Sequence, residues 1–199
     1  MSMDFESDFS LQMADEASLE QCIRIISEVS DTLLDKLFNR IDIKKAMLLV
    51  SQNGSDIFNC DNIYLVKARA DGQIAAMLFA YKVLDDNLPL ILRSMLNKER
   101  FNLLKKVMLS GYKGSFYINT VYVNEKYQGQ GLGSLLMELA KEAARDCQCK
   151  DIFLHCYADN SKALGMYEKY DFKVHDSISY EALPSFKHEK GYILRLELL

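Results

Sequence analysis

The sequence feature that most constrains the fold is a glycine-rich turn, Gln128-Gly-Gln-Gly-Leu-Gly133, between a strand-like run and a helix-like run. Residues 116–123 before it are rich in aromatic and β-branched side chains, which favours a strand. After it, apolar residues recur at helical spacing from Leu132 to Cys147. The first N–H groups of a helix lack intrahelical partners and lie at the positive end of its dipole, and glycine lets an anion approach them closely. The turn therefore predicts a binding site for a phosphate or pyrophosphate group.

Two better-known glycine loops fit this turn less well. A P-loop ends in Gly-Lys-Ser/Thr, but Gly133 is followed by Ser134 and Leu135. A dinucleotide-binding fingerprint that began at Gly129 would require glycine at position 134, where the chain has serine. On the residues of the turn alone, a glycine-rich turn that binds no ligand is an equal alternative.

Two segments together resemble one known family. Gln128-x-x-Gly131-x-Gly133 is similar to the R/Q-x-x-G-x-G/A signature of the GNAT acyltransferases. Residues 160–172 read N-x-x-A-x-x-x-Y-x-x-x-D-F, which resembles the family's N-x-x-A-x-x-x-Y-x-x-x-G-F. Asp171 replaces the usual glycine, at a turn position where aspartate tolerates a left-handed backbone better than most residues. The order and spacing of the two segments identify the chain as resembling the GNAT N-acetyltransferases.

The resemblance implies an α/β fold with a mixed, mostly antiparallel sheet of six to seven strands, flanked by helices and splayed between the fourth and fifth strands. The order of elements expected from the residues agrees with that of the family. We expect strands at 8–13, 63–70, 73–83, 116–123 and 191–199, and a short strand that runs into a loop over 152–160. Helical runs are expected through 19–26, 33–41, 132–147 and 161–170. Asp71-Gly72 predicts a hairpin, and Gln52–Ser55 predict a turn.

Residues 85–113 carry apolar and basic side chains at helical spacing, which predicts one or two amphipathic helices inserted between the third and fourth strands. This insertion could cap the sheet, wall the acceptor site or form a contact in a homodimer. With 199 residues, of which 49% are hydrophobic, the chain is expected to form a single domain over residues 1–199.

Composition argues against several classes of partner. The net charge is −4, and no basic cluster is interleaved with aromatic residues, so we expect no nucleic-acid partner. No apolar run reaches the length of a membrane span, and the acidic first twenty residues do not resemble a targeting signal. The five cysteines lack paired C-x-x-C spacing, and no histidine completes a metal-ligand pattern. We therefore expect a cytoplasmic protein that binds neither membrane nor metal.

The resemblance also implies the reaction and its residues. Acetyl-CoA would be the acyl donor, and a primary amine of a small molecule or peptide would attack it directly. In the family, the N–H at the position of Val121 faces the thioester carbonyl, Tyr167 matches the tyrosine near the departing sulfur, and Asn160 matches an asparagine that binds the cofactor arm. The expected cofactor-binding residues are Val121, Tyr122, Val123, Gln128, Gly129, Gln130, Gly131, Leu132, Gly133, Ser134, Asn160 and Tyr167. Tyr167 could instead only pack beneath the cofactor, and Asn160 could also cap a helix.

The general base is less evident. Many relatives have a glutamate where this chain has Tyr117, and Asn119, on the same strand face, is no base either. Deprotonation of the amine would then fall to His155, Asp159 or an ordered water, unless His155 is only a core residue. The expected catalytic set is therefore Tyr167, His155 and the N–H of Val121. The missing glutamate keeps a second function open, a non-catalytic acyl-CoA-binding or sensing module, and a nucleotide enzyme unrelated to CoA is a third.

Overall fold

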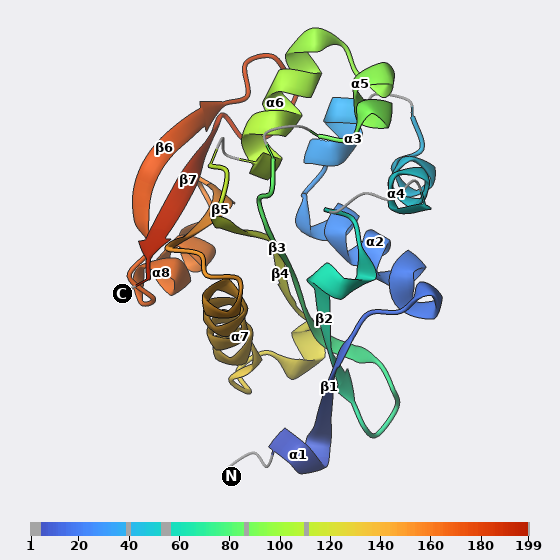
Figure 1. The fold of residues 1–199 in the computed structure, drawn as a ribbon, viewed down its shortest axis with the longest axis vertical. Coiled ribbons are helices and arrows are strands. Elements are labelled where there is room, and N and C mark those ends of the chain that lie inside the picture. The colour runs from blue at the N-terminus through green and yellow to red at the C-terminus, as the bar shows by residue number, and fades with distance from the viewer. Residues whose placement is uncertain (1–4, 39–40, 53–56, 86–87, 110–111, 199) are drawn as a thin grey trace.

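A computed structural model describes residues 5–38, 41–52, 57–85, 88–109 and 112–198 and contains one seven-stranded sheet with helices on both faces (Figure 1). The strand order is β1-β2-β3-β4-β5-β7-β6. Every neighbouring pair is antiparallel except β4 and β5, which are parallel. The strands are β1 (Phe9–Met13), β2 (Ile63–Ala68), β3 (Ile74–Lys82), β4 (Phe116–Val123), β5 (Asp151–Tyr157), β6 (Lys173–Ser179) and β7 (Lys190–Glu197). The predicted mixed sheet is confirmed.

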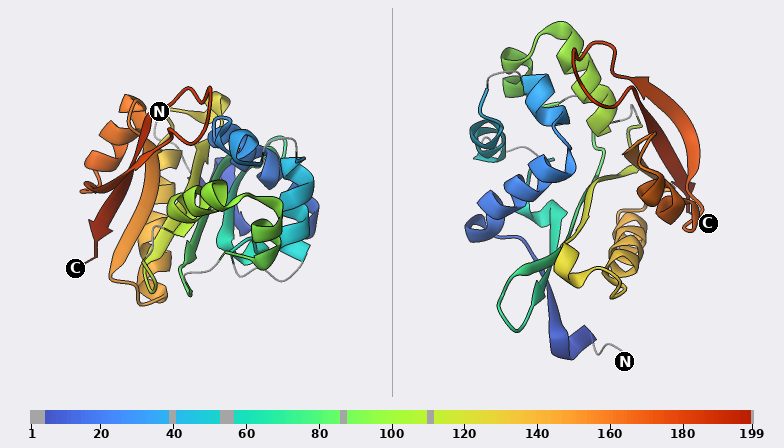
Figure 2. Two further views of the ribbon diagram at one scale, coloured as in Figure 1. Left: turned by 90° about the horizontal axis from the view of Figure 1, so that it is seen from above. Right: turned by 180° about the vertical axis from the view of Figure 1, so that it is seen from behind.

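The helices divide between the two faces of the sheet, as the views in Figure 2 show. One face is covered by α2 (Glu16–Val29), α3 (Leu33–Phe38), α4 (Ile43–Gln52), α5 (Leu90–Met95) and α6 (Lys98–Leu109). The other face is covered by α7 (Leu132–Asp146) and α8 (Ser161–Glu168). The remaining short elements are α1 (Phe5–Asp8), η1 (Cys60–Asn62) and η2 (Glu125–Tyr127).

The central strand β3 separates the two cores. Its side chains alternate, so Met77 and Phe79 join the core beneath α2 to α6, while Leu78 and Ala80 join the core beneath α7 and α8. Residues 74–81 are all buried, which is the pattern of a strand covered on both faces. Two layers of helices thus bury β3 on both of its faces.

The predicted insertion is confirmed as helical, because α5 and α6 lie between β3 and β4. Their buried residues belong to the core beneath α2 to α6, so the insertion caps that face of the sheet. A homodimer contact through the insertion stays a prediction. The predicted hairpin between β2 and β3 is also present, with Gly72 at φ +69°.

Other boundaries differ from the expectation. The second predicted helix ends at Phe38 rather than at Ile41, whose side chain is exposed. Neither α4 nor β6 was expected. A sequence signal for α4 was present, because Asp42 accepts the N–H of Lys45 ahead of an apolar helical face. No such signal marks β6, which is an edge strand with mostly exposed side chains and no alternating pattern. Of the predicted turn Gln52–Ser55, Gln52 ends α4 and residues 53–55 lie outside the described residues.

Within the described ranges, no helix has both the length and the apolar character needed to cross a membrane. Among the same residues, no three or more His, Cys, Asp or Glu side chains gather closely enough to hold a metal ion.

Candidate active site

The parallel strands β4 and β5 separate part of the way along their length. Their pairing covers only Phe116–Ile118 against Ile152–Leu154, although β4 continues to Val123 and β5 continues to Tyr157. Where the pairing ends, β4 also changes register with β3, because Phe79 pairs with Thr120 and Ala80 with Ile118, which leaves Asn119 as an extra residue. Such a bulge bends a strand, so it helps to turn the end of β4 away from β5.

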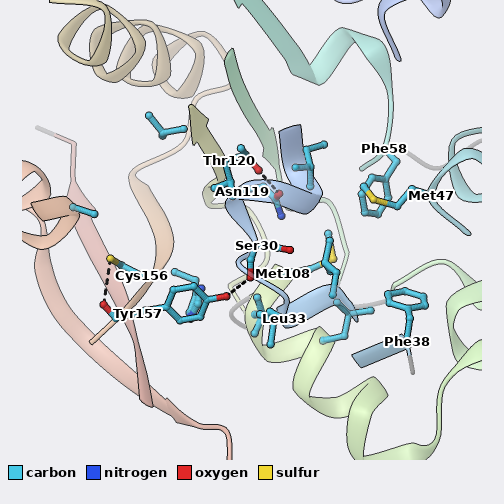
Figure 3. A pocket seen from close by; sticks show the side chains of 18 of the residues that line it. Ser30, Leu33, Phe38, Met47, Phe58, Met108, Asn119, Thr120, Cys156 and Tyr157 are labelled. Atoms are coloured by element: carbon cyan, nitrogen blue, oxygen red, sulfur yellow. Dashed lines mark hydrogen bonds between the residues drawn. The ribbon is translucent and has the colours of Figure 1, made fainter. Parts of the chain in front are cut away.

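A pocket occupies the gap between the separated strands and extends to both faces of the sheet (Figure 3). Asn119, Thr120 and Val121 line one side of the gap, and His155, Cys156 and Tyr157 line the other. From the α8 side, Asn160, Ala163 and Tyr167 contribute to the wall. From the opposite face, the lining comes from apolar residues of α2 to α6 together with Phe58. The pocket therefore connects the two layers through the sheet.

The glycine-rich turn lies where a strand meets a helix, as predicted. Gly129 and Gly131 have φ values of +76° and +78°, a conformation that glycine adopts without strain. Gly131 is the N-cap of α7, and no side chain caps the first amides of that helix. A Cβ added at either glycine would meet no atom within 4 Å, so the space above the turn is open. These features fit the binding of an anion.

Tyr167 of α8 is 9% exposed and lies against Phe172, with ring centroids 5.8 Å apart. Burial raises the pKa of its phenol, and the neighbouring Cys156 thiol contributes in the same direction, so the hydroxyl is protonated at neutral pH. Its hydroxyl makes no hydrogen bond within the described residues, and Tyr167 also lines the pocket. A neutral phenol able to donate a proton is therefore available there.

The residues around α8 adopt the local structure that the second segment predicts. Asn160 accepts the N–H of Ala163 at 3.1 Å and caps the helix while also lining the pocket. After the helix, Asp171 has φ +65°, the left-handed conformation for which glycine is the usual residue. The aspartate therefore replaces glycine here without changing the shape of the turn.

His155 lines the pocket, but most of its ring is enclosed by protein. Its Nε2 atom is hydrogen-bonded to the Tyr180 hydroxyl, and Gly191 of β7 leaves the room for this pair, because a Cβ at that position would overlap both groups. Desolvation, with a smaller effect of His188, lowers the pKa of His155 from its usual 6.5 to about 4. The imidazole is therefore neutral at neutral pH and is a weak base.

Tyr117, at the position where a glutamate was considered, is 1% exposed and donates a hydrogen bond to the carbonyl of Val107 in α6. Next to it, Tyr81 makes the same kind of bond to the carbonyl of Met108, at 2.8 Å. These two phenols satisfy carbonyls at the end of α6. Both act as structural anchors for the helix that walls the pocket.

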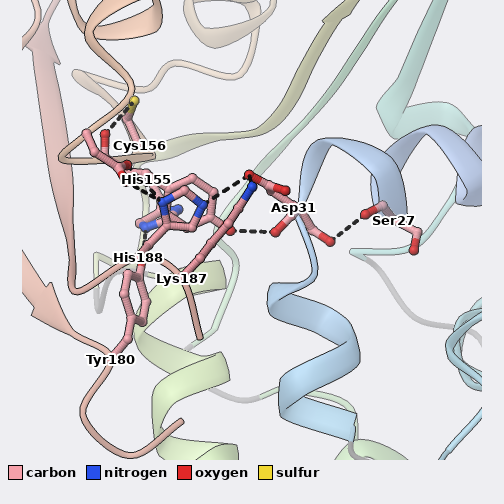
Figure 4. Close-up of polar contacts among 10 residues, drawn as sticks. Ser27, Asp31, His155, Cys156, Tyr180, Lys187 and His188 are labelled. Atoms are coloured by element: carbon pink, nitrogen blue, oxygen red, sulfur yellow. Dashed lines mark hydrogen bonds and ion pairs between the residues drawn. The ribbon is translucent and has the colours of Figure 1, made fainter. Parts of the chain in front are cut away.

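Two groups of contacts at the site were not found from the sequence, although one residue of each, Asp159 and Gln128, was named there. Figure 4 shows His188 between two loops, with its Nε2 atom 3.0 Å from the Asp31 carboxylate. Its Nδ1 atom lies 2.8 Å from Asp159, and Lys187 also contacts Asp31 at 2.6 Å. We call Asp31, Asp159, Lys187 and His188 the ionic clamp. It joins the turn after α2 to the segments that precede α8 and β7, beside Tyr157, on whose ring His188 stacks.

The second group lies at the glycine-rich turn. Lys162, in the first turn of α8, donates a hydrogen bond to the Gln128 side chain at 3.2 Å, and Gln128 also reaches the carbonyl of Val123 at 3.4 Å. A lysine so close to the open space above the turn adds positive charge where an anion would bind. The only sequence signal for it was its place two residues after Asn160.

A model of the acetyltransferase (GNAT) family matches residues 28–172, which is most of the chain. The chain belongs to the GNAT acetyltransferase family. The predicted family is confirmed, and so is the GNAT fold, with its parallel β4 and β5 and its helices between β3 and β4.

Two named GNAT relatives act on different amines, according to their descriptions. The chain is 30% identical over 129 residues to N-alpha-acetyltransferase 60 of Xenopus tropicalis, covering 63% of this chain and 49% of that protein. It is 28% identical over 68 residues to spermine/spermidine N(1)-acetyltransferase of Bacillus subtilis strain 168, covering 34% of this chain and 45% of that protein. The chain thus matches about half the length of these relatives.

The GNAT fold extends over nearly the whole chain. The structure of yncA from Salmonella typhimurium, solved with its cofactor acetyl-CoA, matches with a TM-score of 0.60 and 15% identity, covering 97% of this chain and 95% of that one. At this level of identity, the likeness concerns the fold alone.

Proposed function

We propose that this GNAT chain transfers an acetyl group from acetyl-CoA to a primary amine of a small molecule or peptide. The observation that carries the proposal is the pocket that passes through the sheet between β4 and β5. It lets a donor held on the α7 and α8 face and an acceptor on the opposite face reach the same point. Membership in the GNAT family supports the same reaction.

The residues on the α7 face fit acetyl-CoA, which supplies an activated acetyl thioester when bound. The backbone amides of residues 128–134 would hold the pyrophosphate, because Gly129 and Gly131 open the turn and no side chain caps α7. In this proposal, Val121, Tyr122, Val123 and Asn160 hold the pantetheine arm, since the end of β4 has no paired strand on its β5 side. The acetyl-CoA in the yncA structure agrees with this choice of donor.

The proposed chemistry uses direct attack by the amine. The amine nitrogen forms a bond to the acetyl carbon, and the carbon–sulfur bond breaks. We assign the N–H of Val121 to the carbonyl oxygen, where negative charge develops. Tyr167 gives its proton to the departing sulfur, and the proton that the amine loses restores the phenol through solvent.

We keep His155 in the proposal as an acceptor of the more acidic proton that the nitrogen loses after it has bonded to the acetyl carbon, because the ring is neutral and lines the pocket. Its pKa of about 4 lies far below that of an alkylammonium ion, so it would not deprotonate a bound ammonium efficiently. The amine would therefore bind largely in its neutral form or lose its proton to water. This requirement makes the reaction faster at higher pH.

One observation favours the second candidate, a non-catalytic acyl-CoA-binding module. Among the described residues that line the pocket, none is aspartate or glutamate, so no carboxylate is in place to act as a base. A module of this kind would bind acetyl-CoA without transferring its acetyl group to any amine.

The proposal also includes the cellular compartment in which the chain works. All five cysteines, Cys22, Cys60, Cys147, Cys149 and Cys156, are free thiols in the structure. Free thiols suit a reducing environment, so we propose that the chain works in the cytoplasm.

Calorimetric titration with acetyl-CoA, CoA, ATP and NAD tests the donor site. We expect micromolar binding of the two CoA compounds only, and loss of that binding by at least about tenfold in Gly131→Glu, which places a carboxylate at the helix N-terminus. Equal binding of ATP or NAD would contradict the choice of donor.

Gly114→Glu is the matched control for this titration. Gly114 also has a positive φ, +86°, and open space around its Cβ position, but it lies at the other end of β4. Both variants therefore introduce the same charge and the same kind of backbone strain. Only the change at Gly131 should reduce binding.

A further inference from the structure

The part of the pocket beneath α2 to α6 is lined mainly by apolar side chains. We call it the apolar chamber and define it by Leu33, Leu34, Phe38, Met47, Phe58 and Met108, all of which line the pocket. These side chains come from α3, α4, α6 and the segment before η1, so four separate parts of the chain build one wall. Figure 3 shows several of them across the pocket from Asn119 and Thr120 of β4.

Charged groups are absent from this lining. Among the described residues that line the pocket, none is aspartate, glutamate, lysine or arginine. Its polar groups already have partners: the Tyr157 hydroxyl donates to the carbonyl of Ser30, and Thr120 donates to the Asn119 side chain at 3.0 Å. A second ammonium group placed in the chamber would lose its hydration without gaining a carboxylate.

The carboxylates of the ionic clamp already have partners. Asp31 is bound by Lys187 and His188, and these bonds lower the pKa of its carboxyl group even though partial burial opposes the shift. Asp159 is bound by the other nitrogen of His188. Neither aspartate lines the pocket, so the ionic clamp does not supply a site for a polycation there.

We infer that the acceptor has a single amine group, with a large apolar group next to it that enters the apolar chamber. The inference rests on the proposed acetyl transfer. Each methylene buried there should raise kcat/KM roughly fourfold, since apolar burial contributes a nearly constant free energy for each carbon. The flexible side chains of Met47 and Met108 let the chamber adapt to apolar groups of different shape.

Two pairs of acceptors test this inference with acetyl-CoA as the donor. The first pair is a peptide that begins with norleucine and the same peptide beginning with lysine, and transfer to the α-amine is measured for both. The second pair is pentylamine and cadaverine. Within each pair, the compounds differ mainly by a terminal ammonium group. We expect the member without the additional terminal ammonium group to have at least about tenfold higher kcat/KM. A higher kcat/KM for the norleucine-led peptide than for pentylamine would identify a polypeptide N-terminus as the source of the amine. A higher kcat/KM for pentylamine would identify a small molecule.

Leu34→Glu tests where the selectivity arises. Leu34 is half-buried on α3 and lines the chamber, so a glutamate there can reach the pocket without filling the core. We expect the ratio of kcat/KM values, norleucine-led over lysine-led peptide and pentylamine over cadaverine, to fall by about tenfold or more. Leu49→Glu is the control, because Leu49 is 43% exposed on α4 and does not line the pocket. If Leu34→Glu does not fold, the kcat/KM ratios of the unaltered protein for the two acceptor pairs still test the inference.

Three results would overturn the inference. If kcat/KM for the lysine-led peptide and for cadaverine equals or exceeds that for the norleucine-led peptide and for pentylamine, the chamber does not select against a second charge. Faster transfer from octanoyl-CoA than from acetyl-CoA to the norleucine-led peptide would assign the chamber to the acyl chain of the donor. Absence of transfer to all four amines would refute the proposed function as well, whereas transfer in the wrong order would refute this inference alone.

Discussion

At the scale of single residues, the features that pack Tyr167 also prepare it for chemistry. Its burial beneath α8 raises the pKa of the phenol, so the side chain keeps its proton at every pH at which the protein is expected to work. The ring completes the core around Phe172, while the hydroxyl reaches the pocket. Packing and the proposed proton donation are therefore compatible with one placement.

Tyr167→Phe removes the hydroxyl and keeps the ring. We expect kcat to fall by about 10²-fold, because a positioned general acid contributes roughly that much, while the Kd for acetyl-CoA stays within about threefold. Steady-state kinetics and calorimetry measure the two quantities. Tyr170→Phe is the control, since Tyr170 is three positions further along and does not line the pocket. Unchanged kcat in Tyr167→Phe would refute the proton-donor assignment.

His155 should make stability depend on pH. Because its pKa in the folded chain is about 4 instead of 6.5, the unfolded chain takes up a proton as the pH falls through 6.5 while the folded chain does not. Stability from the neutral ring is complete above that range and is lost as the pH approaches 4. Between pH 7 and pH 4.5, this single group should lower the free energy of unfolding by about 2 kcal/mol.

Urea denaturation of the unaltered protein and of His155→Gln at both pH values measures this contribution. The difference in the free energy of unfolding between the two proteins should be smaller by about 2 kcal/mol at pH 4.5 than at pH 7, since glutamine does not titrate. An equal difference at both pH values would mean that the ring is not enclosed as described.

At the scale of elements, the ionic clamp fixes the turn between α2 and α3. Asp31 and Thr32 have φ values of +49° and +71°, which are uncommon for residues other than glycine and costly for a β-branched residue. The bonds from Lys187 and His188 to Asp31 help to hold this strained backbone in place. Since α3 begins one residue later and walls the apolar chamber, the clamp controls the position of one chamber wall.

His188→Gln should loosen this wall, because glutamine cannot bridge both carboxylates with the geometry of the imidazole. We expect KM for the amine to rise several-fold, with unchanged Kd for acetyl-CoA, and the free energy of unfolding to fall by about 1 kcal/mol. Amide hydrogen exchange over residues 30–34 should accelerate.

His175→Gln controls for the loss of a histidine at an exposed position on β6, away from the clamp. Unaltered exchange over residues 30–34 in His188→Gln would show that the strained turn does not depend on the clamp.

At the scale of the whole molecule, local signals were enough to predict six of the seven strands, the helix after the glycine-rich turn and the hairpin at Gly72. Each of these depends on residues close together in the chain, such as the alternation in β3 or the helical spacing in α7. The family resemblance supplied the mixed, mostly antiparallel pairing and the splay, which the periodicity of single elements does not contain.

The ionic clamp and the apolar chamber could not be predicted in this way. His188 and Asp31 are 157 positions apart, and His188 and Asp159 are 29 positions apart, so no spacing rule relates them. The chamber likewise combines Phe58 with residues of α3, α4 and α6. For His155, the sequence left open whether the ring is a base or a core residue. Its low pKa comes from the surroundings of Tyr157 and Tyr180, which only the fold brings together.

The opening between β4 and β5 also constrains the order of kinetic events. Along the rest of the sheet, in the residues that the structure describes, each strand pairs with its neighbours, so this opening joins the two layers. A donor on the α7 face and an acceptor from the chamber can then occupy the molecule at the same time, each approaching from its own side. Neither product has to leave before the second substrate arrives. The architecture therefore suits a sequential mechanism through a ternary complex rather than a ping-pong cycle.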